Sequence, residues 1–172
     1  VPAVESLGCE WEIHDNPEDG GGPLLIAGLQ EGENLPTVLL YGHGDVVRGL
    51  EGDWEEDRDP WTTDPDGDRL YGRGTADNKG QHAINLLALM TVLEARDGKL
   101  GFNLRILIEM SEEVGSRGLR TFAEEYKEKL KADVLIASDG PRLKPDRPTI
   151  FLGSRGTATF KLSIHAREGG HH

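Results

Sequence analysis

Continuous apolar runs alternate with helical patterns along the middle of the chain. Solid apolar runs at Thr37–Tyr41, Asn103–Met110 and Asp133–Ala137 are typical of strands that are buried on both faces. Between them, Gln81–Ala95 carries apolar residues on most faces and predicts a buried helix, whereas Gly118–Leu130 places one apolar stripe opposite charged residues. Strands of this kind, separated by helices, predict an α/β domain whose mainly parallel sheet is covered by helices.

The first quarter of the chain and the segment before the long helix have weaker patterns. Weak alternation at Cys9–His14 and a short apolar run at Leu24–Ala27 predict two further strands. The segment Gly42–Gly80 is dense in Gly, Asp, Pro and Trp and has no helical or strand period. Loops of this length are uncommon in compact domains and are usually functional, so we expect this segment to contribute to a site.

The pattern changes again in the C-terminal part of the chain. Thr149–Leu152 is a strand candidate, and Ala158–Ile164 alternates apolar and polar residues cleanly, as a half-exposed antiparallel strand does. We interpret the second of these as the first strand of a different α/β unit. The sequence therefore predicts a main domain at residues 1–153 and the start of another at residues 154–172.

Composition and charge narrow the class of protein. The formal net charge of −12 and the pI near 4.9 describe an acidic surface that repels phosphate backbones, so we expect no nucleic-acid partner. The apolar runs are shorter than the roughly 18 residues of a membrane span, so we expect no membrane partner. Cys9 is the only cysteine, which excludes an internal disulfide and a cysteine-based zinc site and favours a reducing, cytoplasmic location.

Candidate metal ligands directly follow three of the predicted strands. His43 and Asp45 come after the first, Glu112 and Glu113 after the second, and Asp139 after the third. Each alone has an ordinary explanation, because a lone histidine or a Glu pair is usually a surface feature and Asp before Gly usually belongs to a turn. In open α/β sheets, however, ligands gather where the strands end, so we expect these side chains at one edge. Their convergence favours a metal site built from imidazole and carboxylate groups.

Several motifs, in this order along the chain, are similar to those of a known family. The motifs are Gly42–Val47, Trp54 with Asp59–Trp61, Asp66–Gly74, Asp77 with Lys79–Gly80, Ser111–Ser116, and Ser138–Asp139. Together they resemble the M20 family of metallopeptidases, which includes aminoacylases, carboxypeptidases, deacetylases and carnosinase-like dipeptidases. The resemblance extends from about Leu24 to the last residue, and Arg155-Gly156 is similar to a feature of the dipeptidase-like branch.

The resemblance implies two divalent metal ions, either zinc or, as alternatives, manganese or cobalt. His43 and Asp139 match ligands of one metal, Glu113 matches a ligand of the other, and Asp77 matches the carboxylate that bridges both. The resemblance also implies a cis peptide bond between Asp77 and Asn78. Imidazole and carboxylate groups are ligands that suit all three metals.

Three further residues match functional positions of the family. Glu112 matches the general base, which would take a proton from the attacking water and pass it to the leaving amine. Asp45 matches the carboxylate that orients the ligand histidine, a role that fixes the tautomer of the imidazole. His172 matches the lid histidine that reaches across a dimer to the oxyanion of the substrate. The alternative is that His171 and His172 begin an expression tag.

The activity implied by this resemblance is that of a two-metal hydrolase, which cleaves peptide bonds of dipeptides or small peptides through a metal-bridging water. The alternatives are an N-acyl-amino-acid deacylase and, in a different class, a non-catalytic metal-binding remnant. The family forms homodimers through a lid domain, whose first strand residues 154–172 would supply. The last metal ligand of the family is a histidine near the C-terminus, which would lie beyond residue 172 of this chain. We therefore expect a chain that is cut short at both ends, is inactive, and holds at most one metal tightly.

Overall fold

The computed structural model describes residues 1–140, 142–144, 146–153 and 156–165. The chain divides into two units, residues 1–139 and residues 140–172. Within the described residues, the first unit contains all of the helices and all of the strands.

Five strands form the sheet at the centre of the first unit, in the order β1-β2-β6-β3-β7. Their bounds are Glu10–His14 (β1), Leu24–Leu29 (β2), Thr37–His43 (β3), Asn103–Glu109 (β6) and Val134–Ala137 (β7). β3 pairs in parallel with β6 on one side and with β7 on the other, whereas β2 pairs antiparallel with both β1 and β6. The predicted α/β fold is confirmed, with parallel strands at the side of the sheet that carries the candidate ligands and two antiparallel strands at the opposite edge.

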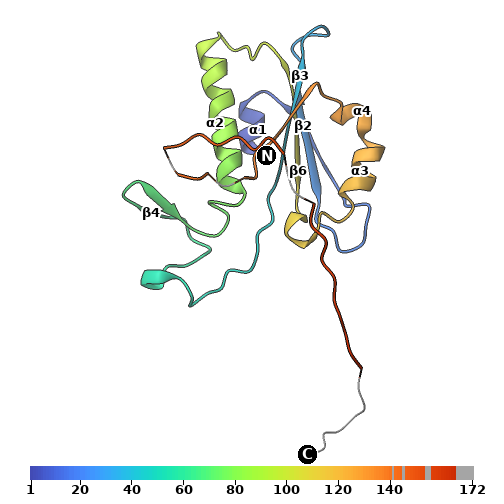
Figure 1. The fold of residues 1–172 in the computed structure, drawn as a ribbon. Coiled ribbons are helices and arrows are strands. Elements are labelled where there is room, and N and C mark those ends of the chain that lie inside the picture. The colour runs from blue at the N-terminus through green and yellow to red at the C-terminus, as the bar shows by residue number, and fades with distance from the viewer. Residues whose placement is uncertain (141, 145, 154–155, 166–172) are drawn as a thin grey trace, which may run out of the picture. The chain divides into compact units, whose positions relative to one another are not determined.

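Helices cover both faces of this sheet (Figure 1). α1 (Pro2–Ser6) and α2 (Lys79–Ala95) lie on one face, and α3 (Leu119–Glu125) and α4 (Lys127–Leu130) lie on the other. A short 3-10 helix, η2 (Glu112–Val114), follows β6. None of the helices in the described part of the chain is long and apolar enough to cross a membrane.

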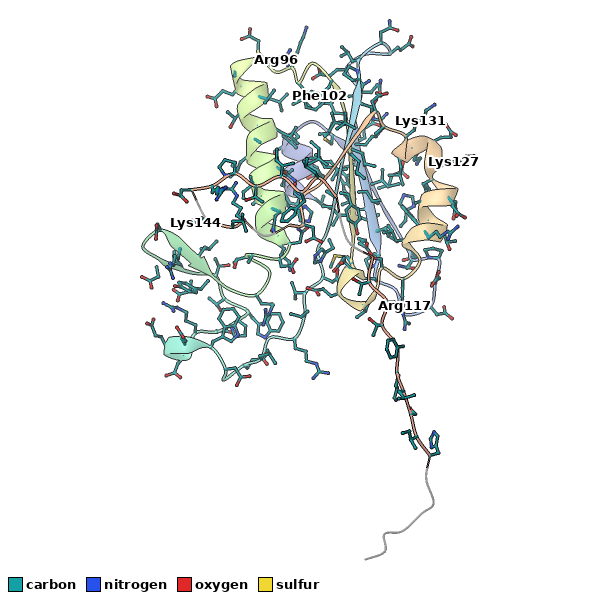
Figure 2. All side chains as sticks on the ribbon, viewed as in Figure 1. Arg96, Phe102, Arg117, Lys127, Lys131 and Lys144 are labelled. Carbon is teal, nitrogen blue, oxygen red and sulfur yellow. The ribbon has the colours of Figure 1, made fainter. Side chains whose placement is uncertain are left out.

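Two apolar clusters join the sheet to its helices, one on each face. Because successive side chains of a strand point to opposite faces, β6 contributes Leu104 and Ile106 to the cluster beneath α1 and α2, and Leu107 to the cluster beneath α3 and α4. Buried members of the second cluster are Leu24, Ile26, Leu107, Phe122 and Leu130. Charged side chains such as Lys127 and Lys131 lie on the outside of the unit (Figure 2).

α2 is less buried than its sequence predicts. Leu89 is buried within the cluster beneath α2, but Ile84 and Leu87 are 55% and 62% exposed. The expectation of a helix buried on most faces is wrong, because the sheet covers only one side of α2. On the other side, no element of the described residues covers these two side chains.

The long segment between β3 and α2 contains short elements that its sequence did not predict. They are η1 (Glu55–Asp57), β4 (Asp64–Asp66) and β5 (Arg69–Tyr71). β4 and β5 form a small antiparallel hairpin. The guanidinium of Arg58 holds this hairpin, because it pairs with both carboxylates of β4 and lies 3.9 Å from the ring centroid of Tyr71. Strands of three residues are too short to give a recognisable alternation in the sequence.

The described residues of the second unit form no helix or strand, although an isolated bridge pairs Lys144 with Arg147. The strands predicted at Thr149–Leu152 and Ala158–Ile164 are therefore wrong. That residues 154–172 begin a lid domain stays a prediction. A strand requires backbone hydrogen-bonding partners along its length, and among the described residues no backbone pairs with these two segments as a strand does. Phe160 is accordingly 88% exposed. The division of the chain at residue 153 stays a prediction.

Replacing Leu104 by Ala should lower the free energy of unfolding by about 2–5 kcal/mol, because this side chain is fully buried and its removal leaves a cavity. Leu87→Ala is the matched control, since it removes the same atoms from an exposed side chain, and a change within about 0.5 kcal/mol is expected. Urea denaturation followed by circular dichroism measures both variants. Equal losses of stability would contradict the assignment of Leu104 to the core.

Candidate metal centre

Side chains from four segments meet at the carboxyl ends of the parallel strands. His43 ends β3, Asp77 lies just before α2, Glu112 and Glu113 follow β6, and Asp139 follows β7. These strand ends share one edge because β3 pairs in parallel with both of its neighbours. The three loops that carry candidate ligands therefore start side by side.

His43 lies at the centre of this group. Its imidazole is fully buried, and Nε2 is 3.0 Å from Oδ1 of Asp77, 3.7 Å from Oδ1 of Asp139 and 3.9 Å from Oε2 of Glu112. Ligand atoms of His43, Asp77 and Glu113 all lie within 4.8 Å of one another. The structure thus brings together the four residues that the sequence suggests as metal ligands, with Glu112 beside them.

The donor set fits a divalent cation. Nδ1 of His43 lies 3.1 Å from the carbonyl oxygen of Asp45 and 3.3 Å from its Oδ1. When Nδ1 carries the proton, Nε2 presents its lone pair toward a carboxylate oxygen of Asp77. This contact is repulsive unless a proton or a cation is bound by both groups. Zinc and related divalent ions accept imidazole and carboxylate ligands of this kind.

Burial and the crowding of acidic groups shift pKa values in this region. Burial raises the pKa of Glu112, and the charges of Asp139 and Glu113 raise it further against the opposing effect of His43. Burial and the charge of Asp77 likewise raise the pKa of Asp139. For His43, burial acts to lower the pKa, but the hydrogen bond with Asp77 and the charge of Asp139 raise it above its ordinary value. The region carries an excess of negative charge that a divalent cation would compensate.

Asp45 connects the imidazole to the loop that follows β6. Its Oδ1 accepts a hydrogen bond from the backbone N–H of Glu112, and its Oδ2 accepts one from the N–H of Glu113, both at 3.1 Å. The same carboxylate lies 3.3 Å from Nδ1 of His43. One side chain therefore fixes both the ring of His43 and the backbone that carries the two glutamates.

Asn78 is a fully buried residue for which the sequence suggested no role. The peptide bond between Asp77 and Asn78 is cis, as the family resemblance implied. Oδ1 of Asn78 accepts a hydrogen bond from the N–H of His43 at 3.1 Å, and Nδ2 donates to the carbonyl oxygen of Ser138 at 2.6 Å and to Oδ1 of Asp139 at 3.1 Å. Asn78 thereby joins the ends of β3 and β7. Its position directly after Asp77 was the available signal in the sequence.

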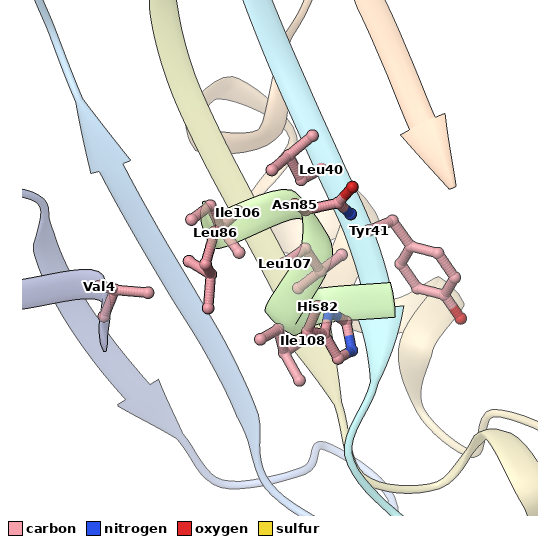
Figure 3. A pocket seen from close by; sticks show the side chains of 9 residues that line it. All are labelled: Val4, Leu40, Tyr41, His82, Asn85, Leu86, Ile106, Leu107 and Ile108. Carbon is pink, nitrogen blue, oxygen red and sulfur yellow. The ribbon is translucent and has the colours of Figure 1, made fainter. Parts of the chain in front are cut away.

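His82 supports β3 from the side of α2. Its Nε2 donates a hydrogen bond to the carbonyl oxygen of His43 at 2.9 Å, and burial lowers the pKa of its ring. A Cβ atom on Gly42 would lie 2.1 Å from Cε1 of His82, so this close approach requires glycine. Figure 3 shows His82 with Asn85 and several Leu and Ile side chains at a small, mainly apolar pocket between α2 and the sheet.

Tyr41, which is partly buried, and Glu109, which is fully buried, form a polar pair near the site, toward the carboxyl ends of β3 and β6. The hydroxyl of Tyr41 donates to Oε1 of Glu109 at 2.5 Å, and burial together with this bond raises the pKa of Tyr41. Glu109 is fully buried, and its Oε2 has no hydrogen-bond partner among the described residues. This pair was not predicted from the sequence, because both residues lie at the ends of apolar runs that read as ordinary strands.

His172, the expected lid histidine, lies outside the residues that the structure describes, and so does its neighbour His171. The described residues of the candidate metal centre all belong to the first unit, between residues 43 and 139.

The chain is similar in sequence to a peptidase family, to dipeptidases and to a desuccinylase. A sequence profile of peptidase family M20/M25/M40 matches residues 39–168. A cysteinylglycine-S-conjugate dipeptidase of Corynebacterium striatum is 34% identical over an alignment of 174 residues, which covers 96% of this chain and 36% of that protein. A succinyl-diaminopimelate desuccinylase of Methylobacterium radiotolerans is 35% identical over 153 residues, covering 86% of this chain and 37% of that protein.

The fold has a corresponding relative among solved structures. The crystal structure of human carnosine dipeptidase 1 superposes with a TM-score of 0.71 and 30% sequence identity, covering 81% of this chain and 31% of that chain. The chain spans about a third of the length of the curated relatives that it matches.

Asn78→Ala should lower the free energy of unfolding of the metal-free chain by at least about 2 kcal/mol. The substitution leaves the N–H of His43 and the carbonyl oxygen of Ser138 without these partners, and each buried group left unpaired costs about 1–3 kcal/mol. Asn34→Ala is the matched control, since Asn34 is exposed in the turn before β3. If urea titrations show the two variants to be equally stable, the joining role assigned to Asn78 is wrong.

Proposed function

Since the chain belongs to peptidase family M20/M25/M40, we propose that it is the metal-binding part of a hydrolase that cleaves the peptide bond of dipeptides or other small peptides. The observation that carries this proposal is the meeting of His43, Asp77, Glu113 and Asp139 beside the carboxylate of Glu112. Hydrolysis of an amide requires an activated water, stabilisation of the developing oxyanion, and a group that transfers a proton to the leaving nitrogen. Glu112 would supply the proton transfer, and a divalent cation held by the other four residues would supply the activation of water and the stabilisation of the oxyanion.

The four ligand residues would hold divalent metal. His43, Asp77 and Asp139 would form one site, and Asp77 with Glu113 would form part of a second. A bound divalent cation would polarise the scissile carbonyl and lower the pKa of the attacking water. We propose zinc, with manganese or cobalt as alternatives, because imidazole and carboxylate donors suit all three metals.

Glu112 is the residue that would move the proton. Its Oε2 lies 3.9 Å from Nε2 of His43, close to the ligand cluster, and its side chain is partly exposed. It would accept a proton from the attacking water at a carboxylate oxygen and deliver it to the nitrogen of the leaving amine. Asp45 would keep this base in place relative to His43, since its carboxylate holds the backbone N–H of Glu112 and lies beside the imidazole ring.

Dipeptides are the substrate class that we favour. The relative from C. striatum and the human structural relative are both named as dipeptidases, and the alignment with the first of them covers 96% of this chain. The similarity to the desuccinylase of M. radiotolerans supports a second candidate function, that of an N-acyl-amino-acid deacylase. A panel of dipeptides and N-acyl amino acids, assayed with the full-length gene product, distinguishes the two. Metal binding without hydrolysis of either class would instead indicate a non-catalytic metal-binding protein.

The family resemblance also supports a homodimer that forms through a lid domain beginning near residue 154. In such a dimer, His172 of one protomer would reach toward the substrate held by the other. Light scattering on the full-length gene product measures the oligomeric state, and a monomer at assay concentration would reject this part of the proposal.

Glu112→Gln should lower kcat of the full-length gene product by about 10²–10⁴-fold, because the amide keeps the shape of the side chain but cannot accept a proton. Metal content should stay at the wild-type value in elemental analysis, since Glu112 is not among the proposed ligands. Glu125→Gln, at an exposed position of α3, is the matched control and should retain wild-type activity. A Glu112→Gln variant with more than half of the wild-type rate would reject Glu112 as the base.

His43→Ala should reduce the amount of metal bound per chain, because it removes the imidazole from the proposed ligand set. Elemental analysis after dialysis gives the stoichiometry directly and does not depend on an activity assay. His165→Ala removes an exposed imidazole and should leave the metal content unchanged. Equal metal content in the two variants would exclude His43 as a ligand.

A further inference from the structure

The base loop, Ser111–Gly118, carries the proposed base Glu112 and has little regular structure. After η2, its backbone passes through three positions with positive φ, namely Gly115 at 93°, Ser116 at 50° and Gly118 at 72°. Three backbone hydrogen bonds close it on itself, from the N–H groups of Val114 and Ser116 to the carbonyl oxygen of Ser111 and from that of Gly115 to the carbonyl oxygen of Glu112. These bonds give the loop its shape, but its position relative to the sheet depends on the segments that pack against it. Its contacts therefore determine where the carboxylate of Glu112 lies.

One such contact comes from the N-terminal segment Asn16–Gly22, which we call the brace. The N–H of Gly22 donates a hydrogen bond to Oγ of Ser111 at 2.7 Å, and Ser111 is almost completely buried. A Cβ atom on Gly22 would lie 2.3 Å from the carbonyl oxygen of Met110, so a side chain is excluded at this position. The brace thus contacts the chain immediately before Glu112, from a segment 89 positions away in the sequence.

Asn16 fixes the brace to the other end of the base loop. Its Nδ2 donates to the carbonyl oxygen of Gly22 and to that of Arg117, each at 2.9 Å, and its Oδ1 accepts from the N–H of Glu18 at 2.9 Å. A Cβ atom on Gly118 would lie 2.0 Å from Oδ1 of Asn16, which shows how closely the two segments pack. Arg117 is labelled in Figure 2, beside η2.

We propose that the brace positions Glu112 for proton transfer, with Asn16 and Ser111 as its positioning residues. This inference rests on the proposed function, in which Glu112 is the base. The amide of Asn16 meets two carbonyl oxygens with its N–H groups and one N–H with its oxygen, so all of these contacts are satisfied. An aspartate at position 16 has the same shape and would still accept the hydrogen bond from the N–H of Glu18. Its second carboxylate oxygen, however, would face the carbonyl oxygens of Gly22 and Arg117 and repel them.

Asn16→Asp in the full-length gene product tests the brace. We expect kcat to fall about 10- to 100-fold and KM to change less than about twofold, because displacing a catalytic group by about 1 Å costs this much rate. Asn34→Asp is the matched control, since it adds the same charge at an exposed turn. In the metal-free protein, the amide hydrogens of Glu112 and Ser116 should exchange with solvent faster in Asn16→Asp than in the control. Ser111→Ala, a second variant, should change kcat and exchange in the same direction.

The double variant Asn16→Asp/Glu112→Gln separates positioning from a general loss of stability. If the brace acts through Glu112, adding Asn16→Asp to Glu112→Gln lowers kcat no further. If the fold-losses in kcat of the two single variants multiply in the double variant, the proposal is overturned. It is also overturned if Asn16→Asp has the same kcat and the same amide exchange rates as Asn34→Asp. If Glu112→Gln alone keeps the wild-type kcat, the proposed function fails, and the exchange rates of the metal-free protein then decide whether the brace holds the base loop.

Discussion

Repulsion between carboxylates is the constraint on which the candidate metal centre depends. The fold brings oxygen atoms of Asp77, Glu112 and Asp139 within 4 Å of one imidazole nitrogen of His43. Burial and the neighbouring negative charges raise the pKa values of Glu112 and Asp139. N–H donors of the chain supply part of the compensation. Protons or a divalent cation would supply the remainder.

Two side chains hold this unfavourable arrangement in one geometry. Parallel pairing of β3 with β6 and β7 brings the strand ends to one edge, but it does not fix the side chains beyond them. Asn78 completes the connection between the ends of β3 and β7, and Asp45 completes the one between β3 and the loop after β6. The sheet therefore provides the approximate position of the ligands, and buried hydrogen bonds provide the final one.

The parts of the fold that the sequence predicted are those that depend on local pattern. Thr37–Tyr41 and the two other apolar runs read correctly as strands because each pairs within the sheet, and the ligands follow because they lie at strand ends. The expected burial on both faces is wrong for β7, which is the edge strand and has Leu135 63% exposed. Ala158–Ile164 was predicted to be a strand, but the structure does not form one. Alternation of apolar and polar residues indicates that a segment can form a strand with one apolar face, but it does not show which strand would pair with it. The role of Asn78 was equally out of reach, because its hydrogen bonds join segments 35 and 60 positions away in the sequence. Neither the composition of the chain nor the spacing of its motifs predicts those contacts.

The way in which Asp45 holds the loop has an evolutionary consequence. Its carboxylate binds the main-chain N–H groups of residues 112 and 113, so it recognises the backbone and not the side chains attached to it. Exchanging either side chain leaves this recognition unchanged, and the loop keeps its shape. Descendants of such a protein can therefore lose or alter their chemistry by single substitutions while retaining the architecture. Similarity of fold among such relatives then persists after their activities have diverged.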